Sequence, residues 1–274
     1  MPIIDTSQDD TYNNRVITPK KFVSNLKINT FHWKRDKVDT RDFLYRTTQK
    51  LIKTKVDLRG FCSPIENQGS LGSCTGQAVA GAIELLNKRN KKPTDVSRLY
   101  IYWYERFLIN TINYDSGAYI RDGIKATNKY GAPLERLWPY IINRFTIKPS
   151  KEANDDAVKR KVTLYERISN FDGCIDALNN GYPIIIGFMV YNSFMTTNVS
   201  KFGMMPYPNT KKEKLLGGHA TLLVGYDLSN NLFIARNSWG GNWGDNGYFY
   251  MPFDVIKNPL MSGDFWIIKN VLNP

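Results

Sequence analysis

The chain has 274 residues, enough for a large core in one domain or in two closely packed lobes. Its 42% apolar and 23% charged residues are typical of a globular protein, and an aromatic content of 13% argues against disorder over most of the length. No run approaches ~20 apolar residues, which excludes a membrane-spanning helix. The first residues also lack the basic start and apolar core of a secretory signal peptide.

The formal net charge of +12 comes from short Lys and Arg clusters that stand beside turn-forming or polar residues. Such clusters are typical of solvated surface, and no RNA- or DNA-binding motif accompanies them. Association with nucleic acid therefore stays the weaker of two interpretations of the charge.

Three cysteines, Cys62, Cys74 and Cys174, cannot all pair with one another, so the sequence predicts free thiols and a reducing compartment. The two histidines are His32 and His219. No C-x-x-C or H-x-x-x-H spacing is present, and we expect no metal site and no cofactor.

In the first half, residues 1–54 lack clear periodicity and form an N-terminal extension with at most one short ordered element. Turn formers fill residues 56–73, and apolar residues at helical spacing then predict a helix that begins at Cys74 and ends at "NKRN". Two more helices are predicted, over 96–110 with a Ser cap and over 115–133.

A polar stretch, 148–161, is the predicted crossing between two lobes. One helix follows at 171–181, and then strands dominate, separated by Gly and Asn turns. The predicted strands are 182–191, 219–227, 231–239, 247–253 and 264–271. The sequence thus predicts an α+β fold, with a helical lobe at about 55–150 and an antiparallel sheet or barrel at about 160–274.

Cys74 stands at the first turn of its predicted helix, after the small residues Gly69, Gly72 and Ser73. Unpaired N–H groups and a partial positive charge at a helix N-terminus stabilise an anion. We therefore expect the pKa of this thiol to lie below its usual value of about 8.5, which would make it a nucleophile. The alternative is a buried cysteine that acts as a small apolar residue.

A thiolate nucleophile needs an imidazole that forms an ion pair with it and later protonates the leaving amine. His219 opens an apolar strand after two glycines, and Asn237 follows 18 residues later beside a tryptophan. An amide in that position could fix the tautomer of the ring. A histidine at a strand edge can also be purely structural.

The order and separation of Cys74, His219 and Asn237 match the pattern of papain and the cathepsins. The sequence resembles the papain-like cysteine peptidases through "QGSLGSCT", "GHATLLVGY" and "NSWGGNWGDNGYFYM", over about residues 55–270. The segments "FMVYNSF", "DSGAYIRDGIKATNKYG" and "LWPY" resemble the disulfide-poor branch of prokaryotes and large DNA viruses. An intracellular or virion-packaged protein is expected from this resemblance.

The resemblance implies a two-lobe papain-like fold, with a cleft between a helical lobe and a β-barrel lobe. It makes Cys74 the nucleophile, His219 its ion-pair partner and acid–base group, and Asn237 the residue that orients the imidazole. Gln68 would donate to the oxyanion together with the Cys74 backbone N–H.

For substrate binding, the resemblance implies Trp243 on the leaving-group side of the cleft and Trp239 as a shield over the Asn–His hydrogen bond. The main side-chain pocket is expected near Tyr191, Ala220 and 264–268, whose apolar character favours hydrophobic substrate side chains.

The activity implied is hydrolysis of polypeptide substrates through a thioester, by a monomer that needs no metal or cofactor. Two alternatives stay open: a transpeptidase or amidase that uses the same dyad, and a catalytically silent binding protein on the same fold.

The sequence departs from the family at three places. Leu71 stands where many members have a disulfide cysteine, and Thr75 replaces the tryptophan that usually follows the nucleophile. The extension 1–54 is shorter than the family's usual propeptide. This extension is either a short inhibitory pro-segment that lies along the cleft of a zymogen, or it belongs to the mature fold together with the peptidase domain, 55–274. His32, within it, is not expected to be catalytic.

Overall fold

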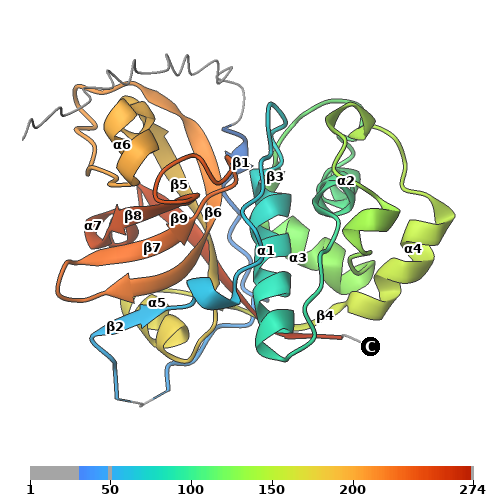
Figure 1. Cartoon of the computed structure of the whole chain (residues 1–274), viewed down its shortest axis with the longest axis horizontal. Helices are drawn as coiled ribbons and strands as arrows, with labels where there is room; N and C mark the ends of the chain where they lie inside the picture. The colour runs from blue at the N-terminus through green and yellow to red at the C-terminus, as the bar shows by residue number, and fades with distance from the viewer. Residues whose placement is uncertain (1–30, 49–50, 273–274) are drawn as a thin grey trace, which may run out of the picture.

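The computed structural model describes residues 31–48 and 51–272. A β-sheet and a group of helices lie side by side, and α1 (Cys74–Arg89) stands at their junction (Figure 1). The other helices are α2 (Arg98–Leu108), α3 (Ile120–Lys129), α4 (Lys151–Ala157), α5 (Phe171–Asn179), α6 (Thr197–Phe202) and α7 (Phe253–Lys257). The strands are β1 (Trp33–Lys34), β2 (Lys55–Asp57), β3 (Ala118–Tyr119), β4 (Val162–Ile168), β5 (Ile184–Tyr191), β6 (Leu215–Asp227), β7 (Leu232–Arg236), β8 (Tyr248–Pro252) and β9 (Ser262–Val271).

The main sheet has seven strands in the order β4-β9-β5-β6-β7-β8, with β2 paired to β6, and all its pairings are antiparallel. Within the described residues no pairing joins β4 to β8, so the sheet is open where the sequence analysis expected a closed barrel. The α+β arrangement and the two lobes agree with the expectation.

The predicted crossing, 148–161, contains α4, whose N-cap Ser150 accepts from the N–H of Ala153. A local cap thus orders a polar stretch that has little apolar periodicity. None of the helices in the described part of the chain is long and apolar enough to cross a membrane.

The helix α1 is the central element, because every residue from Cys74 to Asn87 is buried. Small side chains allow this close packing. A Cβ on Gly76 would lie 3.1 Å from the carbonyl oxygen of Arg98 in α2. On the other side, α1 packs against β6, which carries His219. The most buried helix of one lobe therefore presents its N-terminus to the central strand of the other.

Residues 32–34 of the N-terminal extension lie between the lobes. β1 pairs in parallel with β3 of the helical lobe, and His32 forms a parallel bridge with Gly218 of β6. Residues 31–35 are called the covering segment below, because they lie over the junction that holds Cys74.

Candidate active site

Cys74 lies at the place where the two lobes meet. It is the first residue of α1 and is fully buried. The backbone N–H groups of Ala220, His32 and Thr75 donate toward its sulfur. Ala220 directly follows His219 on β6, so the helix that bears the thiol and the strand that bears the imidazole converge here.

His219 is held in one orientation by Asn237, which follows the end of β7. The distance between His219 Nε2 and Asn237 Oδ1 is 2.9 Å, and the same oxygen accepts from the N–H of Ser238 at 2.9 Å. Two donors on Oδ1 define the amide orientation and place the imidazole proton on Nε2. The Nδ1 atom is buried and has no hydrogen-bond partner among the described residues. It is therefore left as an acceptor for the proton of a thiol.

Burial controls the ionisation of both groups. It raises the pKa of the Cys74 thiol to about 12, although the Ala220 N–H opposes this. Burial also lowers the pKa of His219 to about 4, although the hydrogen bond that the imidazole donates to Asn237 opposes this. The expectation of a lowered thiol pKa is wrong for this conformation, because loss of water around the sulfur outweighs the helix N-terminus. The pair is uncharged while the junction is covered.

Gln68 is fully buried beside this pair. Its side-chain Oε1 accepts from the Ser238 hydroxyl at 2.6 Å, and its Nε2 donates to the Leu71 carbonyl at 2.9 Å. Its backbone N–H donates to the Ser238 carbonyl at 2.8 Å. An amide nitrogen has two N–H donors. With one directed to Leu71, the second can serve an oxyanion.

Tryptophans cover the imidazole. The ring centroids of Trp239 and His219 are 4.9 Å apart at 33°, and Trp243 meets Trp239 edge-on at 4.9 Å. Phe188, opposite His219 on β5, lies 5.7 Å from its ring. The imidazole is fully buried among these rings, and this burial lowers its pKa.

The structure separates two residues that the sequence analysis placed together. Ala220 stands opposite Gly187 in the β5–β6 register, whereas Tyr191 lies four residues further along β5, opposite Leu215. At ~3.3 Å per residue, Tyr191 is about 13 Å along the strand from the position that faces Ala220. Sequence reasoning missed Gly187, although a lone glycine within a strand indicates a close approach by another group.

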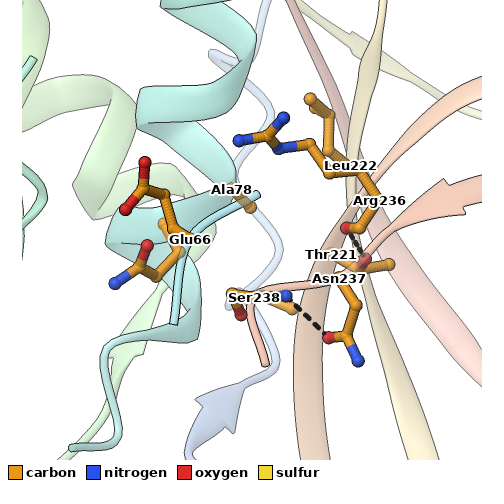
Figure 2. Close-up of a pocket in the computed structure, with 9 residues that line it drawn as sticks. Glu66, Ala78, Thr221, Leu222, Arg236, Asn237 and Ser238 are labelled. Atoms are coloured by element: carbon orange, nitrogen blue, oxygen red, sulfur yellow. Dashed lines mark hydrogen bonds between the residues drawn. The ribbon is translucent and has the colours of Figure 1, made fainter. Parts of the chain in front are cut away.

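A small cavity lies behind the site, between α1 and the strands β6 and β7. Figure 2 shows Glu66 and Ala78 on one side of it and Thr221, Asn237 and Ser238 on the other. Its volume of about 10 Å³ suffices for about one water molecule. It is too small to accept an amino-acid side chain.

The covering segment packs against the groups that surround Cys74 and His219. The Phe31 ring lies 6.2 Å from the His219 ring and 6.0 Å from that of Trp239. A Cβ on Gly72 would come within 2.7 Å of the His32 ring, and one on Gly187 would lie 1.9 Å from Trp33. The indole of Trp33 thus occupies space that only glycine leaves on β5, and it is 5% exposed.

Ion pairs anchor the chain directly after the covering segment. Asp36 accepts from the indole N–H of Trp266 at 2.8 Å, and its own backbone N–H donates to Asp264 at 2.7 Å. Arg167 binds Asp264 and Asp42, each at 3.0 Å. Burial and the neighbouring Asp264 raise the pKa of Asp36 to about 7. The segment is therefore fixed to β4 and β9 by an interlocked group of charges.

The departures from the family pattern fit their surroundings. Thr75 is buried and donates to Glu105 of α2 at 2.6 Å, so its side chain faces the helical lobe and not the cleft. Cys62, Cys74 and Cys174 are all free and buried. In the part of the chain that the structure describes, no group of three His, Cys, Asp or Glu side chains could hold a metal ion.

Comparison with known proteins identifies relatives along most of the chain. A sequence profile of the papain family cysteine proteases matches residues 52–262. A protein of Acanthamoeba polyphaga mimivirus, described as an uncharacterized peptidase C1-like protein, is 39% identical over 89% of this chain and 88% of its own. Chymopapain of Carica papaya is 27% identical over 77% of this chain. The chain spans only 52–64% of the length of its plant and protist relatives.

Solved structures agree. Xylellain, a cysteine protease from Xylella fastidiosa, superimposes with a TM-score of 0.82 at 38% identity, over 90% of this chain and 98% of that one. Digestive procathepsin L 3 of Tenebrio molitor has a TM-score of 0.67 at 19% identity, over 87% of this chain and 75% of its own, and shares the fold. With its α+β architecture and its matched profile, the chain belongs to the papain family of cysteine proteases.

Proposed function

We propose that the chain hydrolyses peptide bonds through Cys74 and His219, with Asn237 orienting the imidazole and Gln68 donating to the oxyanion. The observation that carries this proposal is the meeting of the α1 N-terminus with the strand of His219. The imidazole there is fixed through Nε2 and open at Nδ1.

The steps follow from this arrangement. The Cys74 sulfur attacks the peptide carbonyl carbon while its proton passes to His219 Nδ1. The carbonyl oxygen becomes an oxyanion that the Gln68 amide and the Cys74 backbone N–H stabilise. The C–N bond then breaks, and the amine leaves with the proton from His219. Water attacks the thioester and gives a proton to Nδ1. The C–S bond then breaks to release the acid, and His219 returns the proton to the sulfur.

Replacing Cys74 by alanine is expected to abolish cleavage of a peptide library, because no other group at the junction can form the thioester. The buried position tolerates the smaller side chain, so the melting temperature should stay near that of the wild type. Product masses report whether water or an amine takes the acyl group. Cleavage that persists in the variant would contradict the proposal.

We infer that the covering segment restrains this activity. Support comes from Phe31, His32 and Trp33, which pack around the two reacting groups, and from the uncharged state that burial imposes on Cys74. Residues 36–57, in contrast, contribute ion pairs and the strand β2 to the fold. Activation then withdraws residues 31–35 and leaves residues 36–48 and the strand β2 in place.

The three free thiols support a reducing compartment or a virion as the site of action.

A further inference from the structure

The side chain of Tyr140 contacts both ends of the loop that leads from Gln68 to Cys74. We call residues 68–73 the oxyanion loop. The hydroxyl of Tyr140 lies 2.9 Å from the Gln68 carbonyl oxygen and 2.6 Å from the Ser73 hydroxyl. A carbonyl oxygen can only accept, so the phenol proton points to Gln68 and Ser73 donates to the phenol. Burial raises the pKa of Tyr140, which keeps this proton in place.

The contact changes what Ser73 does. A serine at the N-cap usually accepts from an N–H of the first helical turn. Ser97 caps α2 in this way and Ser150 caps α4, whereas Ser73, the N-cap of α1, makes no such bond. Its hydroxyl is directed to Tyr140 instead. The N–H groups of Thr75 and Gly76, at the positions that an N-cap side chain usually serves, therefore receive no bond from the Ser73 side chain. The Ser73 hydroxyl instead ties the start of α1 to Tyr140.

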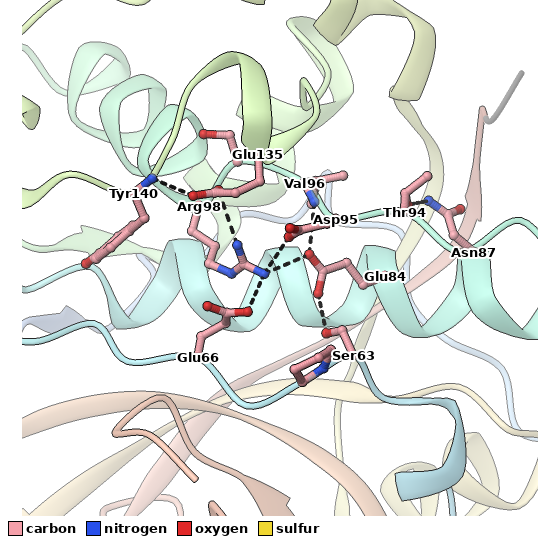
Figure 3. Close-up of polar contacts among 12 residues, drawn as sticks. Ser63, Glu66, Glu84, Asn87, Thr94, Asp95, Val96, Arg98, Glu135 and Tyr140 are labelled. Carbon is pink, nitrogen blue, oxygen red and sulfur yellow. Dashed lines mark hydrogen bonds and ion pairs between the residues drawn. The ribbon is translucent and has the colours of Figure 1, made fainter.

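Tyr140 is itself held from behind. Its backbone N–H donates to Glu135 Oε1, and Glu135 Oε2 lies 3.2 Å from Arg98. Arg98 also binds Glu66 at 2.7 Å and Glu84 of α1 at 3.1 Å. Figure 3 shows these groups converging on the Arg98 guanidinium. The phenol is thus attached to a buried cluster that includes α1, so it can fix the loop relative to the helix.

We propose that Tyr140 is a positioning residue that clamps the oxyanion loop, so that the Gln68 amide and the Cys74 N–H converge on one point. The proposal rests on the proposed function. The clamp does not touch the imidazole or the sulfur, and it should leave the nucleophilicity of the thiolate unchanged. Its effect should be confined to steps that generate an oxyanion.

The test compares two reactions of Cys74 in the full chain. Peptide hydrolysis passes through an oxyanion, whereas alkylation by iodoacetamide displaces iodide and forms none. Tyr140→Phe keeps the ring but removes the hydroxyl. We expect kcat to fall about 10–100-fold, as for small displacements of catalytic groups, with KM within about twofold. The alkylation rate should equal that of the wild type. Tyr114→Phe, on an exposed ring, is the matched control and should change neither rate.

Two results would overturn the clamp. One is hydrolysis by Tyr140→Phe at the wild-type rate. The other is an equal loss of hydrolysis and alkylation, because that would place the effect on the dyad or on the fold. If Tyr140→Phe loses its thermal unfolding transition, Ser73→Ala decides. That variant keeps the Gln68 contact, and we expect a smaller loss of kcat with unchanged alkylation; an unchanged kcat would reject the clamp. A Trp33→Ala chain, with the covering segment loosened, that is alkylated at Cys74 but never hydrolyses peptides would instead refute the proposed function, and the clamp with it.

Discussion

At the scale of single residues, the chemistry depends on how much water reaches Cys74 and His219. In the covered state the pKa of the thiol is about 12 and that of the imidazole about 4, so neither group is charged near neutral pH. Water that enters when the covering segment leaves would solvate both charges and allow the ion pair. The same two side chains are thus inert or reactive according to what covers them.

Replacing Trp33 by alanine is expected to raise the rate at which iodoacetamide alkylates Cys74 at pH 7. Loss of a buried indole removes about 3–5 kcal/mol of packing, which loosens the covering segment. Each unit by which the thiol pKa falls then increases the thiolate about tenfold, so we expect at least a tenfold gain. Mass spectrometry of the peptide that contains Cys74 measures the rate. Phe43→Ala replaces a residue that is 71% exposed and should leave the alkylation rate unchanged. Equal alkylation rates in Trp33→Ala and the wild type would refute the restraint by the covering segment.

At the scale of elements, β5 is shaped to receive the covering segment. Gly187 faces Ala220 across the β5–β6 pair, and the absence of a side chain there admits the Trp33 indole. A strand glycine normally weakens a sheet, so its presence beside the site has a packing reason.

Gly187→Ala should weaken docking of the segment and raise peptide turnover, because the new Cβ would lie 1.9 Å from Trp33. Each 1.4 kcal/mol lost from docking favours the open form by about tenfold. Turnover of a fluorogenic peptide and limited proteolysis before residue 48 measure the opening together. Gly241→Ala adds a Cβ with no atom within 4 Å and serves as the control. If turnover and proteolysis of Gly187→Ala match those of the control, the space at Gly187 does not hold the covering segment.

Patterns within short stretches of the sequence were sufficient to predict the two elements that carry Cys74 and His219. The start of α1 at Cys74 and the strand of His219 were readable, because a helix start and an apolar strand leave patterns over a few residues. The substrate pocket near Tyr191 and Ala220 stays a prediction; their separation along β5 was not readable, because strand register is set by partners that the sequence does not name. The raised pKa of Cys74 depends on burial by residues more than 40 positions away, which no local pattern encodes.

At the scale of the whole molecule, Arg167 joins elements distant in the chain. It lies between Asp42, which follows the covering segment, and Asp264 of β9, and it is 3.9 Å from Asp36. Asp42 also binds Arg121 of α3 at 2.6 Å. Removing one arginine leaves buried carboxylates without enough positive charge.

Arg167→Gln is therefore expected to lower the free energy of unfolding by about 3–5 kcal/mol at pH 8. The loss should be smaller at pH 5. The pKa of Asp36 is raised to about 7 in the folded state, so its contribution is complete below the unfolded value of 3.8 and is lost as the pH rises through 7. Urea denaturation at both pH values measures the difference. Lys151→Gln, in an exposed pair with Asp155, should cost under about 1 kcal/mol; equal losses for the two variants would contradict the assignment.

The attachment of the covering segment to Asp36 and β2 has a kinetic consequence. An inhibitor that belongs to the same chain is present at a fixed effective concentration, in the millimolar range for short tethers, however far the sample is diluted. Latency would then be a property of each molecule alone, indifferent to enzyme concentration, and a free peptide would have to outcompete a neighbour that never diffuses away.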